Sequence, residues 1–545
     1  MNTRSPQPRH ALSTDELVKI PGTPINRREI LKLAGAGAIA TTMATLSMKA
    51  WMPQRVNALA QATNFPDTQF DIGQFVHPAT TVNGIQVQFG VTYTYFAPTT
   101  LSRTPTKTDQ AVLEKALQTI ETSYPFSPNG VFTMVAYGLP YFNNLPSSLV
   151  NANIPHLASN NSRLVLEEAV PSPTDVSSSN PGITKKTFNV PVIIETNQVL
   201  FILRSDSLTI IQDVAAWLQG SNKLNGNSIA SPAFGGLFTF RPARLNFVQP
   251  GLPRAMAGQQ NFSFQSSVNP ASSMWMGFVD QQVNASAPKA SNVTFAGTGP
   301  NSSGTGAAHL TTAVAGDYFD NGSIIHLSHN IQDLAQFYEN DSTSQETFSE
   351  RLQYMFRSTN QSGTPALIFP QDPNDAFTNG GGQGAPTGST AVQQQSAFLP
   401  NFFTGTNAQS INFDPAVTDH KKYRVGHTCG LQRSSRAADG TPLHIRIDGP
   451  GASSLDVPNG SVQPTLEFAV FVPTAEFFRV LRINAASLDY VKAGEGGGTA
   501  ASVPPGIEAA DGGDDGLERF LTATRRQNWL IPPRRHRAFP LIELT

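Results

Sequence analysis

The chain has 545 residues, of which 39% are hydrophobic and 14% are charged, with a single cysteine. This length is enough for two or three domain-sized units with a substantial core. One cysteine excludes a framework of intramolecular disulfides, and it excludes zinc sites built on several thiolates. The formal net charge of −2 provides no driving force for binding nucleic acid, so no nucleic-acid partner is predicted.

The first 60 residues predict an export signal. Arg27 and Arg28 precede a weakly apolar stretch at 33–48, the pattern of a bacterial twin-arginine signal. The Ala-Leu-Ala sequence at 58–60 has the small-x-small pattern of a peptidase site, so we expect cleavage after Ala60. The alternative is that the segment stays uncleaved as a membrane anchor. The twin-arginine translocase is thus an expected partner, and the periplasm, the cell surface or the extracellular space is the expected location.

Charge is distributed unequally between this signal and the rest of the chain. Residues 1–60 carry a net charge of +5, whereas the remainder carries 29 basic and 36 acidic residues. We therefore expect a mildly acidic mature protein. Because twin-arginine export moves folded proteins, it also raises the expectation of a cofactor inserted before transport.

The first half of the mature chain predicts strands and helices in alternation. Apolar residues at every second position predict a half-buried strand over 85–95, and a period of 3.6 predicts a helix over 108–123 with Thr108 as its N-cap. The same reading gives the remaining elements: a strand at 131–137, a strand at 199–203, a helix over 207–219 that stops at Gly220, and a closing strand at 237–240.

The second half repeats this alternation. We expect a strand at 323–328, one or two helices over 331–357, strands at 443–447 and 466–472, and a helix near 475–483. Two successive β-α-β…β-α-β units imply an α+β fold made of two ferredoxin-like halves with antiparallel sheets packed toward one another. We place the first half at 66–270 and the second at 271–545.

Three low-complexity stretches and the C-terminal tail complete the chain. The stretches at 286–306, 371–398 and 493–515 are rich in Gly, Ser, Pro and Gln, and we expect surface loops there. The tail from Leu517 is expected to pack back onto the body through its apolar residues and to carry its arginines on a solvated face.

Few residues stand out as candidates for chemistry. His427 lies between Gly426 and Gly430, which allow a bulky group to approach the backbone. His444, Arg446 and Asp448 fall on one face of a predicted strand, and that face could equally be a solvated one.

Three further positions can be explained by a structural role alone. His326 and His329 are three residues apart on a strand and point to opposite faces, so we interpret them as structural or surface residues. Asp280 follows Gly277 in a tight turn, where an Asp is more often a turn residue than an acid.

The order of these pieces resembles the dye-decolorizing (Dyp-type) peroxidase superfamily, a family of haem enzymes made of two ferredoxin-like halves. The resemblance is carried by the Gly-x-x-Asp turn at 277–280, by His427 in its loop and by Arg446 on the later strand. More narrowly, the chain is similar to an exported, uncharacterised branch of that superfamily. Two departures are present: Gln281 replaces the final Gly of the acid motif, and Thr-Cys follows His427.

This resemblance implies a haem b site with defined roles. It implies that His427 is the axial ligand of the haem iron, and that Asp280 and Arg446 are the distal catalytic pair. His444 and Asp448 are implied as further cofactor-binding residues, and Glu476 as a carboxylate that could hydrogen-bond the axial His. The implied partners are hydrogen peroxide and an aromatic or phenolic reductant.

Three alternatives stay open at this point. A protein of the same fold could bind haem or another partner without catalysis, which Gln281 favours. A non-haem metal oxidase could use His427, His444 and His326. Cys429 could be a thiolate ligand in place of His427.

Overall fold

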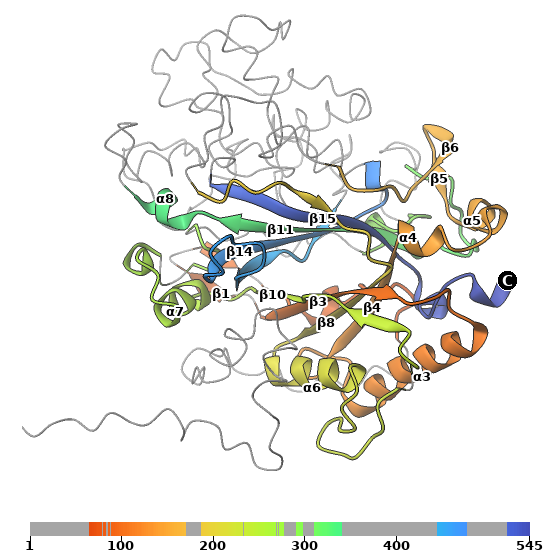
Figure 1. The fold of residues 1–545 in the computed structure, drawn as a ribbon, viewed down its shortest axis with the longest axis horizontal. Helices are drawn as coiled ribbons and strands as arrows, with labels where there is room; N and C mark the ends of the chain where they lie inside the picture. The colour runs from red at the N-terminus through yellow and green to blue at the C-terminus, as the bar shows by residue number, and fades with distance from the viewer. Residues whose placement is uncertain are drawn as a thin grey trace, which may run out of the picture.

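A computed structural model of the chain describes residues 65–170, 187–276, 290–297, 310–339, 444–476 and 520–545, apart from positions 79, 83, 84, 88, 233, 269 and 271. These residues form a large antiparallel sheet with helices against it (Figure 1). The predicted α+β class with antiparallel strands is therefore confirmed. The half boundaries at 66–270 and 271–545 stay predictions, and the signal at 1–60 lies outside the described residues.

The first half is a ferredoxin-like unit. Its elements in chain order are β3 (Tyr93–Leu101), α3 (Lys107–Ser123), β4 (Phe132–Gly138), β8 (Val199–Ser205), α6 (Leu208–Leu218) and β10 (Arg244–Phe247). The strands lie in the order β10-β3-β8-β4, and every neighbouring pair is antiparallel. The β3-α3-β4 and β8-α6-β10 segments thus interleave as two split β-α-β units.

The second half repeats the strand order of the first. Its strands are β11 (Ser323–Gln332), β12 (Ile445–Arg446), β13 (Gly449–Ser453), β14 (Gln463–Val472) and β15 (Leu521–Ile531). They lie in the order β15-β11-β14-β12, and β13 also pairs with β14. Strands β4 and β15 are hydrogen-bonded through Tyr137–Gly138 and Trp529–Leu530, so the two halves form one continuous sheet.

Shorter elements surround this sheet. They are β1 (Thr80–Val82), β2 (Ile85–Val87), α4 (Leu139–Phe142), α5 (Ser147–Asn153), β5 (His156–Leu157), β6 (Asn160–Leu164), β7 (Ile193–Ile194), β9 (Phe238–Phe240), α7 (Leu252–Gln259), α8 (Leu334–Tyr338) and the 3₁₀ turns η2 (Gly73–Phe75), η3 (Gln265–Ser267), η5 (Ala290–Asn292), η9 (Arg534–His536) and η10 (Ile542–Leu544). In the part of the chain that the structure describes, no helix is long and apolar enough to cross a membrane.

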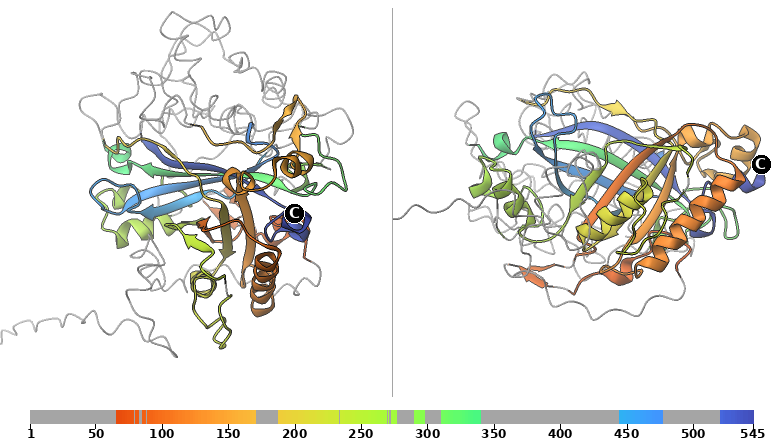
Figure 2. Two further views of the ribbon diagram at one scale, coloured as in Figure 1. Left: turned by 45° about the vertical axis from the view of Figure 1, so that its right-hand side comes forward. Right: turned by 60° about the horizontal axis from the view of Figure 1, so that its bottom comes forward.

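Helices α3 and α6 cover the outer face of the first half (Figures 1 and 2). Leu113, Leu117 and Ile120 of α3 pack into the same buried cluster as Val135 of β4 and Phe201 of β8. Helix α3 begins with a capping box, in which the Thr106 side chain accepts a hydrogen bond from the backbone N–H of Asp109, and the Asp109 side chain accepts one from the backbone N–H of Thr106.

The space enclosed between the two halves is filled with apolar side chains. Strand residues of both halves contribute to it, among them Phe132 and Leu327. The N-terminal segment of the described chain inserts Phe70, and the ring of Phe70 stacks on Phe471 of β14 with 4.3 Å between ring centroids. This interior is therefore a packed core.

Two glycines allow the ends of the sheet to meet. Strand β10 lies against β13, and the side-chain amide of Asn246 donates a hydrogen bond to the carbonyl of Ile447 at 2.9 Å. A Cβ on Gly449 would lie 2.6 Å from Cγ2 of Val248, and a Cβ on Gly451 would lie 2.7 Å from the carbonyl oxygen of Leu245. The close approach of β10 and β13 thus requires glycine at both positions.

We expect Gly451→Ala to destabilise the protein by about 1–3 kcal/mol, the usual cost of an added methyl group in a packed region. The added methyl would also meet Oγ1 of Thr465 in β14 at 2.6 Å, so β13 or one of the strands beside it must move. Urea unfolding would measure the loss. Gly73→Ala is the matched control, because a Cβ at Gly73 meets nothing within 4 Å. Equal stability of both variants would show that the β10–β13 contact tolerates a side chain.

Several predicted boundaries differ from the structure. The alternating segment 85–95 is divided between β2 and the start of β3. The first helix begins after Thr106 and not at Thr108. The predicted helix from residue 331 is wrong at its start, because β11 continues to Gln332 and α8 follows. The closing strand of the first half is β10, and the predicted strand near 237–240 is β9, which also pairs with β3.

The C-terminal tail does more than pack onto the body. Its first part is β15, a strand inside the sheet between β4 and β11. The predicted solvated face is wrong for this tail, because Arg526 and Arg537 are buried and Arg537 forms ion pairs with Glu114 and Glu121 of α3. The tail therefore attaches the first helix to the sheet.

Candidate functional site

The outer face of the second half carries the residues that the sequence singles out at 444–448. Ile445 and Ile447 pack toward the enclosed apolar core. Because side chains alternate along a strand, His444, Arg446 and Asp448 point to the outer face. The prediction that these three residues share one face is thereby supported by the packing of their neighbours.

Strand pairing arranges this face in two rows. In the first row His326 of β11 is opposite Val470 of β14, and Val470 is opposite Arg446 of β12. Asn528 of β15 extends the row on the other side of His326. Since neighbouring strands are about 4.8 Å apart, His326 and Arg446 flank Val470 at roughly 10 Å from each other, measured between backbones.

The second row lies one side-chain repeat along the strands. Ser328 of β11 is opposite Phe468 of β14 and, on its other side, Arg526 of β15. The register of β12 and β13 on β14 places Asp448 beside Phe468. The two rows together give an apolar strip on β14 with polar side chains on both flanks.

His326 is fully buried and hydrogen-bonded at both ring nitrogens. Its Nδ1 lies 2.6 Å from Oδ1 of Asn528, and its Nε2 lies 2.5 Å from Oγ of Ser328. The Nδ2 group of Asn528 donates to the backbone carbonyl of Glu167 at 3.0 Å. The segment before β7 therefore fixes the amide that contacts His326.

Arg446 and Asp448 lie within reach of an ion pair. Nε of Arg446 is 3.9 Å from Oδ1 of Asp448, and their side chains are 16% and 11% exposed. His444 is buried at the start of the same strand. The structure thus brings three of the predicted site residues together on one sheet face. The other two, Asp280 and His427, lie outside the described residues, as do Gln281 and Cys429.

Glu476 forms an ion pair with Arg163, and its implied hydrogen bond to His427 stays a prediction because His427 lies outside the described residues. Its Oε2 accepts a hydrogen bond from Nη2 of Arg163 at 2.8 Å, and Arg163 also pairs with Glu167. This ion-pair group lies next to the outer face, because Glu167 also bonds Asn528. These ion pairs hold the 163–167 segment against Glu476, which follows β14.

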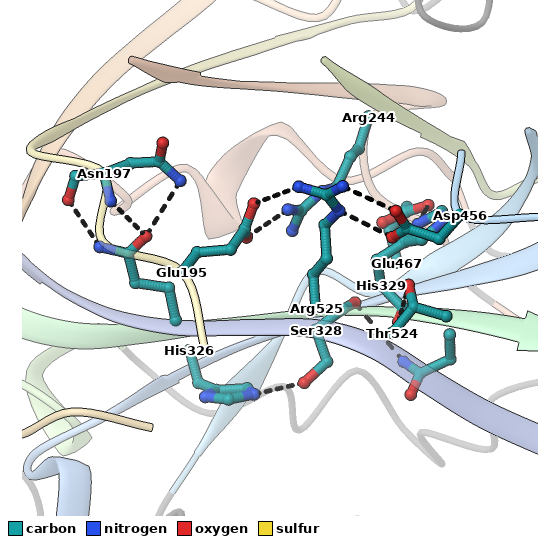
Figure 3. Close-up of polar contacts among 12 residues, drawn as sticks. Glu195, Asn197, Arg244, His326, Ser328, His329, Asp456, Glu467, Thr524 and Arg525 are labelled. Carbon is teal, nitrogen blue, oxygen red and sulfur yellow. Dashed lines mark hydrogen bonds and ion pairs between the residues drawn. The ribbon is translucent and has the colours of Figure 1, made fainter. Parts of the chain in front are cut away.

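A second polar group lies on the opposite side of the strands, as Figure 3 shows. Glu195 forms an ion pair with Arg244 of β10, and both side chains are almost completely buried. Arg525 of β15 is 3.5 Å from Glu195 and forms a bidentate pair with Asp456 at 2.6 and 2.7 Å. This inner ion cluster, defined as Glu195, Arg244, Arg525 and Asp456, links the two halves.

The arginines of the inner ion cluster keep its two carboxyl groups ionised. Burial alone would raise the pKa of Glu195, but Arg244 and Arg525 outweigh it and lower that pKa. Burial likewise opposes ionisation of Asp456, and the hydrogen bonds from Arg525 lower its pKa. Both carboxylates are therefore ionised and paired at neutral pH.

His329 adds a buried pair beside this cluster. Its Nδ1 lies 2.7 Å from Oε1 of Glu467, and Thr465 donates to the same oxygen at 3.2 Å. His326 and His329 thus point to opposite faces, as their spacing predicts, and both are buried. Among the residues that the structure describes, no three His, Cys, Asp or Glu side chains are placed to hold a metal ion.

Sequence reasoning missed Ser328 and Asn528 as site residues, and it considered His326 only as a ligand of a non-haem metal. The only signal in the sequence was the alternation along 323–332, which predicts the side chains that share a face but not the strand that lies beside them. The partner Asn528 is 202 residues away in the sequence. Its polar neighbours in β15 made that segment resemble a solvated tail.

Comparison with known families gives a partial match. A family of unknown function (DUF7405) matches residues 93–363, a span that runs from β3 past β11. No curated protein matches the chain.

Solved structures of Dyp-type proteins are similar in overall arrangement. The encapsulated DyP-type peroxidase from Mycobacterium smegmatis is 12% identical with a TM-score of 0.36, and the match covers 82% of this chain and 94% of that chain. A DypB variant from Rhodococcus jostii RHA1 in complex with heme is 12% identical with a TM-score of 0.37, covering 82% and 94%. The dye-decolorizing protein from V. cholerae is 11% identical with a TM-score of 0.36, covering 81% and 94%. At this level of similarity none of them assigns a role to a residue of this chain.

Proposed function

We propose that this chain is an exported haem peroxidase of the dye-decolorizing type, which oxidises aromatic or phenolic compounds with hydrogen peroxide. The observation that carries the proposal is the outer face of the second half, where Arg446 and His326 flank Val470 and where Asp448 and Ser328 flank Phe468.

The other described sheet surfaces lack such a set of polar side chains around an apolar strip or hold their charges in closed ion pairs. Helices α3 and α6 cover the outer face of the first half, and apolar side chains and the inner ion cluster fill the space between the halves. Among the described sheet surfaces, the outer face of the second half is the one that places Arg446, His326 and Asp448 around an apolar strip, and this supports it as the cofactor surface.

The chemistry of this face fits one side of a haem b group. A porphyrin needs an apolar surface, which Val470 and Phe468 supply. The side on which peroxide reacts also needs a fixed positive charge and groups that exchange a proton, and Arg446 and His326 have those properties. By the sequence resemblance, His427 would hold the iron.

The protein residues have separable tasks. Haem, when bound, supplies the iron at which peroxide is reduced and substrate electrons are received. Arg446, held beside Asp448, would stabilise the oxygen that becomes negative as the O–O bond lengthens. Asp280 would move a proton between the two peroxide oxygens, and His444 and Asp448 would help to position the cofactor.

Haem binding is the decisive test. The purified full-length chain should develop a Soret band on titration with hemin, and the His427→Ala variant should lose it. The loaded protein should then decolorise a phenolic dye with hydrogen peroxide. If the wild-type chain shows no Soret band, the haem proposal is wrong. A Soret band without dye turnover would instead support a non-catalytic haem-binding protein.

Export is tested independently of haem. We expect the Arg27→Lys and Arg28→Lys double variant to accumulate as precursor in the cytoplasm, because the translocase reads the arginine pair. Fractionation with an antibody against the mature chain measures the precursor. The control replaces Arg4 and Arg9 by lysine, which leaves the pair intact. Unchanged export of the Arg27/Arg28 variant would contradict the twin-arginine route.

A further inference from the structure

The inference concerns His326, which the sequence resemblance leaves without a role. This side chain is completely buried, yet it lies on the sheet face that carries Arg446. A buried imidazole needs partners for both ring nitrogens, and Asn528 and Ser328 supply them. The identity of those partners determines where the imidazole proton lies.

The hydrogen bonds define one tautomer of His326. Because Nδ2 of Asn528 donates to the carbonyl of Glu167, the oxygen Oδ1 of Asn528 is directed to Nδ1 of His326. An amide oxygen is only an acceptor, so Nδ1 carries the hydrogen. In the neutral imidazole Nε2 then has the lone pair, and the Ser328 hydroxyl donates to it at 2.5 Å.

Asn528, His326 and Ser328 are arranged as in sites where a base activates a hydroxyl group. A base in contact with a hydroxyl, itself oriented by a third group, is the arrangement by which enzymes withdraw a proton through that hydroxyl. Ser328 is in the same row as Phe468 and Asp448, and His326 is in the same row as Arg446. The hydroxyl and the guanidinium thus border the same apolar strip.

We propose that Ser328, His326 and Asn528 form a proton relay for the reaction with hydrogen peroxide, in which Nε2 of His326 holds the proton. The proposal rests on the proposed peroxidase function and deepens it: the relay holds the transferred proton in place of Asp280, to which the resemblance assigns that transfer. His326 acts through Ser328 and is therefore a positioning residue for the proton. Asn528 acts only by fixing the tautomer.

The relay leaves its own residues unchanged over one cycle. Oγ of Ser328 takes a proton from one oxygen of hydrogen peroxide and passes its own proton to Nε2. When the O–O bond breaks, both bonding electrons go to the departing oxygen. The relay returns its proton to that oxygen, which leaves as water together with its original hydrogen. The other oxygen takes two electrons and two protons from two molecules of the phenolic reductant of the proposed function, which become phenoxyl radicals, and it leaves as a second water.

The tautomer is measured without cofactor or activity. In the haem-free full-length chain labelled with ¹⁵N-histidine, the His326 signals are assigned by their loss in His326→Gln. We expect the shift of a protonated nitrogen for Nδ1 and that of an unprotonated nitrogen for Nε2 at neutral pH. A protonated Nε2 with an unprotonated Nδ1 would overturn the relay.

The reaction with peroxide is measured on the haem-loaded chain by stopped-flow absorbance. We expect His326→Gln and Ser328→Ala each to slow this step about 100-fold, the lower range for positioned proton transfer, with an unchanged Soret band. Ser328→Thr keeps the hydroxyl and should retain most of the rate. His77→Gln is the control, because His77 makes its hydrogen bond to Asp206 in the first half.

The outcomes separate this inference from the proposed function. A wild-type chain that binds no haem contradicts the proposed function, and with it the peroxide role of the relay. Haem binding with a normal rate in both Ser328→Ala and His326→Gln contradicts the relay alone. If His326→Gln does not fold, equal rates for Ser328→Ala and Ser328→Thr still overturn the relay.

Discussion

Replacing Arg446 with leucine is expected to slow the reaction of the haem-loaded protein with hydrogen peroxide by about 100- to 1,000-fold. Removing one preorganised donor from the place where charge develops costs about 2.7–4 kcal/mol of barrier in enzymes. Arg446 meets the conditions for such a role, because its side chain is only 16% exposed and Asp448 lies 3.9 Å from its Nε. Stopped-flow absorbance at several peroxide concentrations measures the rate.

Haem binding itself should survive this change. Leucine keeps most of the apolar stem that lies beside Val470, so the Soret band and the hemin affinity are expected to stay close to those of the wild type. Arg241→Leu is the control, since Arg241 is an exposed residue between β9 and β10. If Arg446→Leu reacts with peroxide as fast as Arg241→Leu, then Arg446 does not stabilise the developing charge.

Local periodicity was sufficient to predict the repeated architecture. Alternation predicted β4, β8, β11 and β14 to within a few residues, and the period of 3.6 predicted α3 and α6. The alternation at 444–448 also predicted the common face of His444, Arg446 and Asp448. Both periods are properties of consecutive residues, so they can be recognised in the sequence without knowing which segments pack together in space.

Strand β15 could not be predicted in the same way. Four consecutive polar residues, Arg525 to Asn528, are typical of a solvated segment, and here both faces of the strand are buried. Their burial depends on partners far away in the sequence: Asp456 for Arg525, and His326 for Asn528. A charge is buried at low cost only where its partner is supplied, and the sequence does not show which strands will be adjacent.

The same limit applies to the two histidines of β11. Period two correctly separates His326 and His329 onto opposite faces. It does not show that one meets an amide and a hydroxyl while the other meets Glu467. Those partners decide that one imidazole belongs to the candidate site and the other to the buried interior beside the inner ion cluster.

Replacing Glu195 with glutamine is expected to lower the free energy of unfolding by about 3–5 kcal/mol. Removing one member of a buried ion pair leaves the other charge uncompensated, and Arg244 is almost completely buried. The double variant Glu195→Gln with Arg244→Met should lose less, because no buried charge remains without a partner. Arg103→Leu, which breaks a pair whose arginine is 50% exposed, should cost much less than Glu195→Gln.

The effect of Glu195→Gln should also depend on pH in a direction set by the ion pairs. Burial opposes ionisation, but Arg244 and Arg525 lower the pKa of Glu195 below its usual range in the folded protein. A carboxyl group with a lowered folded pKa stabilises the protein fully above its unfolded pKa, and this contribution is lost as the pH falls through the folded pKa. The wild type therefore approaches the variant on acidification, because protonated Glu195 resembles glutamine in charge. Urea unfolding of both proteins between neutral and acidic pH measures the difference. A difference that stays constant or grows as the pH falls would show that Glu195 is not an ionised partner of Arg244.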